Sequence, residues 1–188
     1  MPNEADELLD LVDSNDQVIG VIRRGDADAR GRNGNFLMAA SCFVINDQDQ
    51  IWVPRRQLTK TIKPGALDFS AGGHIGSGED YLSGLLREIT EEIGLNPDSH
   101  ELHFIAKQAP NETKPGIYFQ ALYLLWANDV PHFSTIDFSG FEWLSITELR
   151  TRLANGELAK DSLAYSVEQL SAYLGEDDGN HKRHKEII

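Results

Sequence analysis

The sequence is poor in cysteine. Cys42 is the single cysteine among 188 residues, so the chain cannot form an internal disulfide. A chain without internal disulfides fits a reducing compartment, and we predict a cytoplasmic location. Because Cys42 lies inside the apolar stretch MAASCFVI, we expect its thiol to be a small buried part of the core.

Positive charge and long apolar runs are also scarce. Lysine and arginine number 17 against 30 aspartates and glutamates, which gives a formal net charge of -13. A protein this acidic is not expected to wrap a nucleic-acid polymer or to bind an anionic membrane surface. The longest apolar-leaning stretches, MAASCFVI and IYFQALYLLWA, are too short to cross a bilayer as helices. A ligand that carries phosphate would therefore need a bound cation or a local basic patch.

The apolar segments that are present predict an α+β fold. Two of them flank the turn-prone letters DSND and predict a hairpin over about 6–24. Further strands are expected on both sides of NDQD, near LDFSA and within ELHFIAKQA and IYFQALYLLWA, and helices at about 79–93, 146–155 and 161–174. Mostly antiparallel strands with few helices indicate an α+β sandwich. The length suits one domain over 1–175, followed by a polar tail at 176–188.

The helix expected at 79–93 is bounded by its own sequence. Ser77 or Gly78 can cap its start, with Asp80 as the partner in a capping box. Gly94 suits a left-handed turn at its end. At about 100° per residue, one apolar stripe of the helix faces the core. It consists of Leu82, Leu85, Leu86, Ile89 and Ile93.

Negative charge is crowded directly beside this stripe. Glu88, Glu91 and Glu92 fall within an arc of roughly 100° around the helix. At ~5 Å and an effective dielectric constant of ~20, each pair of like charges costs about 3 kcal/mol. An arbitrary acidic helix face is usually just solvated. Alternatively, a hard divalent cation converts the repulsion into attraction.

The spacing around these glutamates resembles the Nudix box. Five residues separate Gly73 from Glu79, and seven separate Glu79 from the segment REITEEIGL at 87–95. The family pattern is glycine, five residues, glutamate, seven residues, Arg-Glu, an aliphatic residue, any residue, Glu-Glu, any residue, glycine and an aliphatic residue. Every fixed position is met. With ordinary residue frequencies, a chance match is on the order of one in a million or rarer.

The resemblance implies a fold and an activity. Nudix proteins are αβα sandwiches with a mixed, mostly antiparallel sheet, and their box is a loop–helix–loop that holds a divalent cation, Mg²⁺ or Mn²⁺. The family hydrolyses a diphosphate linked to another group, and water attacks phosphorus. For this chain the resemblance implies Glu88, Glu91 and Glu92, with the carbonyl of Gly73, as ligands of the cation.

The same resemblance implies further catalytic residues. Glu91 or Glu92 would take a proton from the water, Arg87 would orient a glutamate of the box, and Glu79 would support the site. Family members usually draw another acid or base from outside the box. The sequence offers three acids for this role and does not choose among them: Glu112, Asp137 and Glu142.

The segment WVPRRQLTKTIKPGALDFSAGGH resembles a narrower group, the Nudix hydrolases related to isopentenyl-diphosphate isomerase. It holds the densest basic cluster before the C-terminal tail: Arg55, Arg56, Lys60 and Lys63. Beside the box, these cations could contact substrate phosphate. They could equally be the solvated edge of a hairpin.

The isomerase itself fits less well. It uses a cysteine in the loop before the box and a metal site rich in histidine. Here that loop, LDFSAGGH, has no cysteine, and no histidine precedes His74. The first prediction is therefore hydrolysis of a nucleoside di- or triphosphate or a related nucleoside-diphosphate-linked substrate. An isomerase-like or isoprenoid-diphosphate enzyme is the second, and a catalytically silent ligand-binding module is the third.

Other aromatic and imidazole side chains have two interpretations. His74 directly follows Gly73 and could touch the metal or the substrate. The three tryptophans could stack on a nucleobase, but such residues more often pack in the core. They are Trp52, Trp126 and Trp143. A homodimer through a strand or the N-terminal hairpin is left open.

Overall fold

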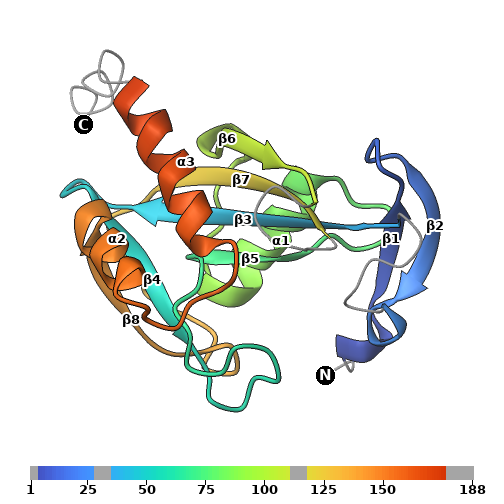
Figure 1. Cartoon of the computed structure of the whole chain (residues 1–188), viewed down its shortest axis with the longest axis horizontal. Helices are drawn as coiled ribbons and strands as arrows, with labels where there is room; N and C mark the ends of the chain where they lie inside the picture. Colours follow the sequence, from blue (N-terminus) through green and yellow to red (C-terminus); the bar gives the residue numbers. More distant parts are fainter. Residues whose placement is uncertain (1–3, 28–34, 111–117, 177–188) are drawn as a thin grey trace.

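A mixed six-stranded sheet lies at the centre of the computed structural model, which describes residues 4–27, 35–110 and 118–176 (Figure 1). The strand order is β6 (His103–Gln108), β7 (Tyr118–Trp126), β3 (Leu37–Ile45), β4 (Gln50–Arg56) and β8 (Phe138–Ser145). A short strand, β5 (Ala71–His74), also pairs with β3. The pair β3–β7 is parallel, and the other pairs are antiparallel. The predicted mixed, mostly antiparallel sheet is confirmed.

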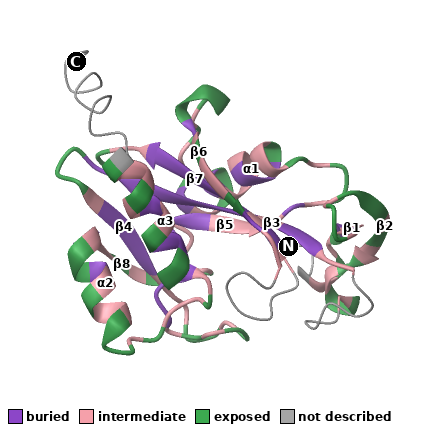
Figure 2. Ribbon diagram, turned by 45° about the horizontal axis from the view of Figure 1, so that its top comes forward, coloured by how far each residue is buried: buried purple, intermediate pink, exposed green. Residues whose placement is uncertain are grey.

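Helices cover both faces of this sheet. Successive side chains of a strand point to opposite faces, so β3 contributes to two cores. On one face Ala40, Cys42 and Val44 pack with α1 (Tyr81–Ile93). On the other face Phe43 and Ile45 pack in a cluster with residues of α2 (Ile146–Ala154) and α3 (Leu163–Glu176). Figure 2 shows the central strands buried between these layers. The predicted αβα sandwich is therefore confirmed.

Cys42 is fully buried in the α1-side core, as its apolar neighbours predicted. Burial is the main cause that raises the pKa of its thiol, and the charge of Glu92 adds to the effect. A buried thiol with a raised pKa is protonated and unreactive at neutral pH. Cys42 therefore serves packing in this fold.

The N-terminal hairpin forms a separate two-stranded sheet at one end of the molecule (Figure 1). It consists of β1 (Leu8–Val12) and β2 (Val18–Arg23), within the predicted range, and short 3-10 turns flank it at Glu4–Asp6 and Arg24–Asp26. Backbone bridges from Leu9 to Gly76 and from Val12 to Phe36 attach β1 to the rest of the fold. Another 3-10 turn, Ser99–Glu101, precedes β6.

The prediction for the start of α1 was wrong. Asp80 is the N-cap: its side chain accepts a hydrogen bond from the Ser83 amide at 2.7 Å, and Ser83 completes the capping box. Ser77 instead donates its hydroxyl to Asp10 of the hairpin at 2.6 Å. The helix end was predicted correctly, because Gly94 adopts the left-handed conformation there.

Two further boundaries differ slightly from expectation. The strand expected near LDFSA begins only at its last residue, Ala71. The last helix spans Leu163–Glu176 rather than 161–174, and residues 177–188 of the predicted tail lie outside the described part. In the described ranges, no helix combines the length and apolarity needed to span a membrane. The single domain over 1–175 and the cytoplasmic location stay predictions.

Candidate active site

Helix α1, which carries the glutamates, is fixed at both of its ends and along its inner face. Its N-terminus is closed by the Asp80 capping box and its C-terminus by Gly94. Its inner face is fixed by Leu85, Ile89 and Ile93, all fully buried. The last three residues of β5 and the loop that joins it to α1 form one segment, residues 72–80, which we call the glycine loop. The local sequence thus holds the loop and the carboxylates of α1 in a fixed relation.

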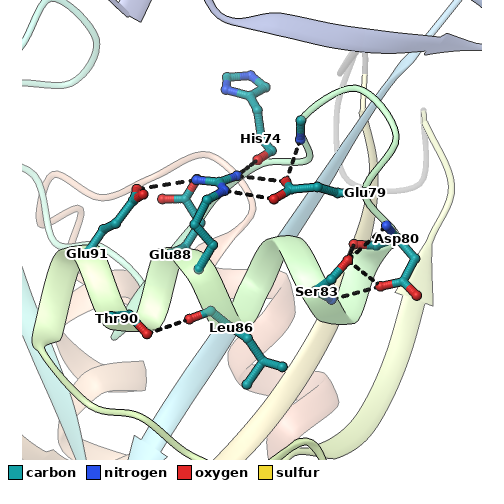
Figure 3. A network of polar contacts seen from close by, with 10 residues as sticks. His74, Glu79, Asp80, Ser83, Leu86, Glu88, Thr90 and Glu91 are labelled. Atoms are coloured by element: carbon teal, nitrogen blue, oxygen red, sulfur yellow. Dashed lines mark hydrogen bonds and ion pairs between the residues drawn. The ribbon is translucent and has the colours of Figure 1, made fainter. Parts of the chain in front are cut away.

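Arg87 ties the glycine loop to the helix. Its Nε and Nη2 atoms each donate to Glu79 at 3.0 Å, and Nη1 donates to Glu88 at 2.8 Å. Nη2 also donates to the carbonyl of His74 at 3.1 Å. Figure 3 shows Glu79, Glu88 and Glu91 turned toward this one guanidinium group. The bond from Arg87 lowers the pKa of Glu79, so Glu79 is a carboxylate that anchors Arg87.

The three box glutamates lie in different environments. The side chain of Glu88 is 14% exposed, whereas that of Glu91 is 59% exposed and only 3.3 Å from Arg87. The Glu88 carboxylate lies so close to Gly73 that a Cβ atom there would approach its Oε1 to 2.4 Å. Glu92 accepts a hydrogen bond from the Gly72 amide at 2.8 Å. Glu88 and Glu92 therefore face the glycine loop, and Glu91 lies at the rim.

Burial raises the pKa of both inner glutamates. For Glu88, desolvation outweighs the attraction of Arg87. For Glu92, desolvation and the nearby charge of Glu88 raise the pKa well above its usual value, and the Gly72 amide opposes them. Two neighbouring desolvated carboxylates are electrostatically costly without a counter-charge. A bound cation would offset this electrostatic cost, so the position between the two carboxylates suits a cation.

The donor set fits a hard divalent cation. Carboxylate oxygens of Glu88 and Glu92 and a backbone carbonyl at Gly73 are ligand types that Mg²⁺ and Mn²⁺ accept. Gly73 leaves room at this point that a larger residue would fill. Among the described residues, no three His, Cys, Asp or Glu side chains lie together in a group that could hold a metal ion by itself. The chain therefore offers a partial donor set.

Comparison with known proteins agrees with this geometry. The NUDIX domain profile matches residues 35–164. The chain belongs to the Nudix hydrolase family. A Nudix hydrolase of Deinococcus radiodurans is 38% identical over 167 residues, 89% of this chain and 95% of that protein. A crystal structure from D. radiodurans matches with a TM-score of 0.78 at 38% identity, over 87% of this chain and 98% of that one.

The family also includes more distant relatives of another activity. An isopentenyl-diphosphate isomerase of Photorhabdus laumondii is 34% identical over 90 residues, 47% of this chain and 49% of the isomerase. This agrees with the predicted branch of Nudix proteins. The likeness is partial, because it spans about half of each protein.

The acids outside the Nudix box lie in distinct places. The charge of Asp137 contributes to the raised pKa of Glu92. Its segment also meets the Nudix helix, because the Ser134 amide donates to the backbone carbonyl of Glu92 at 2.7 Å. Glu142 is instead held by Arg152 at 2.7 Å, which lowers its pKa. Glu112 lies outside the described residues, so Asp137 is the described candidate at the site.

Sequence reasoning missed one acid near the Nudix helix. Asp68 is 8% exposed and its charge also raises the pKa of Glu92. It accepts a hydrogen bond from Arg56 at 2.6 Å. The signal was present, because an aspartate interrupts the apolar letters LDFSA just before the Nudix box.

The predicted phosphate-binding cations divide into two pairs. Arg56 contacts Asp68, and Lys60 contacts Asp137, both at 2.6 Å. These two cations therefore belong to the surroundings of Glu92. The other pair binds carboxylates between α2 and α3: Arg55 contacts Glu157 at 2.6 Å, and Lys63 contacts Asp161 at 2.7 Å. Phosphate contact stays a prediction for all four, and position favours Arg56 and Lys60.

The tryptophans serve packing. Trp52 is fully buried and packs against Phe138 and Phe141, so it offers no free face to a nucleobase. Trp126 packs edge-on against His103, and Trp143 packs against the α1-side core. The structure therefore supports the core interpretation for these side chains.

His74 lies within the Nudix box, directly after Gly73, and its ring is neutral. Its ring centroid is 5.2 Å from that of Tyr118. Burial, followed by the charges of Arg24 and Lys160, lowers its pKa to about 3. An imidazole that stays neutral can accept or donate a hydrogen bond but adds no positive charge to the site.

Proposed function

We propose that this Nudix hydrolase uses Mg²⁺ or Mn²⁺ to hydrolyse a diphosphate linkage in a nucleoside di- or triphosphate, or in a related nucleoside-diphosphate-linked substrate. The observation that carries the proposal is the pair of desolvated carboxylates, Glu88 and Glu92, held against Gly73 and Gly72. A diphosphate anion would be repelled by these groups unless a cation lay between them.

Each residue of the box then has a role. Glu88, Glu92 and the Gly73 carbonyl would hold the cation, and Glu91 would complete the set from the rim. The cation, when bound, supplies charge neutralisation at phosphate oxygens and a lowered pKa for water. Arg87 orients Glu88, and Glu79 anchors Arg87. Between Glu91 and Glu92, Glu92 better suits the proton acceptor, because it lies inside against the Gly72 amide whereas Glu91 lies at the exposed rim.

The alternatives have less support. An isomerase-like reaction needs groups that the loop before the box lacks, and Cys42 is buried in the core. A silent binding module would not need the complete set of Arg87 and glutamates that this box keeps. Small-molecule diphosphates are therefore the proposed partners, and a homodimer stays untested.

A substrate panel tests the proposal. Nucleoside di- and triphosphates, nucleotide sugars and isoprenoid diphosphates would be incubated with Mg²⁺, Mn²⁺ or EDTA. We expect phosphate or nucleoside monophosphate to appear only with metal. Rearrangement of isopentenyl diphosphate without phosphate release would favour the isomerase, and binding without turnover would favour the module.

Metal binding should be visible as a stability gain. At a Mg²⁺ concentration ten times the dissociation constant, the native state gains about 1.4 kcal/mol, which raises Tm by roughly 3–6 °C. Glu88→Gln should lose most of this shift because it removes an inner ligand. Glu168→Gln, in a surface ion pair with Arg150, should keep it. Equal shifts in both variants, measured by differential scanning fluorimetry, would refute the assignment of Glu88.

The acid from outside the box can be identified by a matched pair. We expect Asp137→Asn to lower kcat about a hundred-fold, the usual size of a general acid–base contribution. Glu142→Gln should stay within about two-fold of wild type, because Glu142 is held by Arg152 and Arg55, whereas Asp137 is the acid whose charge acts on Glu92. Steady-state kinetics with melting curves checks this. The opposite order of effects would assign the role to Glu142.

A further inference from the structure

Strand β1 of the N-terminal hairpin lies along the glycine loop and pairs with its backbone. Leu9 forms a bridge with Gly76. The Ser77 amide donates a hydrogen bond to the carbonyl of Leu8 at 2.8 Å. Gly76 and Ser77 belong to the five-residue stretch before Glu79, where the Nudix pattern fixes no residue type. The hairpin therefore holds a part of the box on which the sequence pattern sets no condition.

Asp10 of β1 adds side-chain contacts to this backbone pairing. Its Oδ1 atom accepts a hydrogen bond from the Ser77 hydroxyl at 2.6 Å, and its Oδ2 atom accepts one from the Gly78 amide at 3.0 Å. Asp10 is only 6% exposed. A buried carboxylate is unfavourable unless its oxygens are hydrogen-bonded. Because each oxygen of Asp10 has a partner in the glycine loop, the carboxylate favours one placement of that loop.

The residues that Asp10 holds belong to the tight turn that directs Glu79. The Glu79 amide donates to the carbonyl of Gly76 at 3.0 Å, and the Gly76 amide donates to Glu79 Oε2 at 2.8 Å. Glu79 in turn accepts two hydrogen bonds from Arg87, each at 3.0 Å (Figure 3). A continuous series of hydrogen bonds therefore connects Asp10, the turn, Glu79 and Arg87.

A second carboxylate of the hairpin holds the start of α1. Tyr81, the first residue of the helix, donates its hydroxyl to Asp16 at 2.8 Å. Lys107 of β6 also pairs with Asp16. The hairpin thus contacts the chain on both sides of Glu79, at the turn before it and at the helix start after it. The loop and the helix are both fixed relative to the hairpin.

We infer that Asp10 is a positioning residue for the hydrolysis: it holds the turn before Glu79, so that Glu79 keeps Arg87 where it orients Glu88. The inference rests on the proposed function, because it gives Asp10 a role in the geometry of the metal-binding glutamates. Asp10 acts through the glycine loop and not by contact with the substrate. Its loss should therefore lower kcat and leave KM nearly unchanged.

Asp10→Ala tests the inference against a matched control from the same hairpin. Asp13→Ala also removes two hydrogen bonds from one carboxylate, but these come from the amides of Asn15 and Gln17 in the hairpin turn, at 2.8 and 3.0 Å. With the preferred diphosphate and Mg²⁺, Asp10→Ala should lower kcat at least about ten-fold and keep KM within about three-fold of wild type. Asp13→Ala should keep the kcat of wild type.

Asp10→Asn is the conservative variant and should recover most of the lost activity. Its carboxamide oxygen can accept from the Gly78 amide, and its NH₂ group can donate to the Ser77 hydroxyl oxygen. Ser77→Ala removes the hydroxyl donor alone and provides a milder variant should Asp10→Ala not fold. We expect Ser77→Ala to lower kcat less than Asp10→Ala, again with little change in KM.

An NMR signal from Arg87 reports the same contacts without turnover. The Nε–H group of Arg87 donates to Glu79, so its proton should exchange slowly and give a distinct ¹⁵N-correlated signal. The signal should shift or disappear in Asp10→Ala and stay unchanged in Asp13→Ala.

The outcomes separate this inference from the proposed function. If wild type hydrolyses diphosphates and a folded Asp10→Ala protein keeps its kcat, the positioning role is wrong while the hydrolase stands. Equal losses of kcat in Asp10→Ala and Asp13→Ala would also overturn it, because they would show a general effect of weakening the hairpin. If no diphosphate is hydrolysed with metal, the proposed function fails. The Arg87 signal then decides: a change confined to Asp10→Ala supports the hold on the loop, and no change overturns it.

Discussion

Replacing Glu92 by glutamine is expected to lower kcat for the preferred diphosphate by at least about a thousand-fold while the protein stays folded. A loss of this size corresponds to about 4 kcal/mol of transition-state stabilisation. Glutamine keeps the size of the side chain, and its carbonyl oxygen can still accept the Gly72 amide that now binds Glu92. It removes the charge and the proton acceptor, on which the proposed chemistry depends.

The same change should not weaken the fold at neutral pH. The folded-state pKa of Glu92 is raised by burial, so its ionised form opposes folding. This group therefore contributes stability below its unfolded-state pKa and loses it as pH rises through the raised folded-state pKa. Glu92→Gln should lack that loss. Kinetics and melting curves measured together check both effects.

A matched control separates charge at the site from charge elsewhere. Glu168→Gln removes one exposed carboxylate from a surface pair with Arg150 and should leave kcat unchanged. Wild-type turnover in a folded Glu92→Gln protein would remove Glu92 from the mechanism. Unfolding of that variant would instead show that Glu92 has a structural role.

Replacing Gly72 by alanine should mainly lower stability, whereas replacing Gly73 by alanine should mainly lower activity. At Gly72 a Cβ atom would lie 2.5 Å from the Ala40 carbonyl oxygen and 2.7 Å from the Ser41 Cα, both in the backbone of β3. This backbone cannot retreat without breaking strand pairing. We expect Gly72→Ala to destabilise the fold by about 3 kcal/mol or more, a fall in Tm of roughly 6–12 °C.

At Gly73 the obstacle is only the end of a side chain. The added Cβ would lie 2.4 Å from Glu88 Oε1, and that carboxylate can rotate away. Stability should therefore fall by about 1 kcal/mol or less. Activity should fall about a hundred-fold, because Glu88 loses its position beside Arg87.

Thermal unfolding and kinetics of both variants distinguish the two mechanisms. Gly140→Ala is the control, since a Cβ atom there meets nothing within 4 Å. A stable Gly72→Ala protein would contradict the close approach of β5 to β3. A fully active Gly73→Ala protein would mean that the position of Glu88 does not matter.

Local patterns in the sequence were enough to predict most of the fold. The hairpin, the apolar stripe of α1 and its end at Gly94 each depend on residues close together in the chain. The start of α1 was mispredicted because the hydroxyl of Ser77 is used by Asp10, far away in sequence. A single sequence does not reveal which of two possible caps has another partner.

The sequence predicted which residues form the candidate site but not the environment of each side chain. A helical wheel places the three glutamates in one arc, yet it does not show that the glycine loop covers Glu88 and leaves Glu91 exposed. The basic cluster had a similar limit. Its cations lie close together in sequence, but their carboxylate partners, such as Asp137, come from distant segments. Long-range pairing of this kind depends on tertiary structure.

The contacts of Arg87 give the spacing of the sequence pattern a physical meaning. One guanidinium group binds the His74 carbonyl at the start of the glycine loop and Glu79 near its end. We expect the five-residue spacing between Gly73 and Glu79 to be the one that lets a single guanidinium group reach both partners. A loop one residue longer or shorter should break these hydrogen bonds without altering any proposed metal-binding side chain.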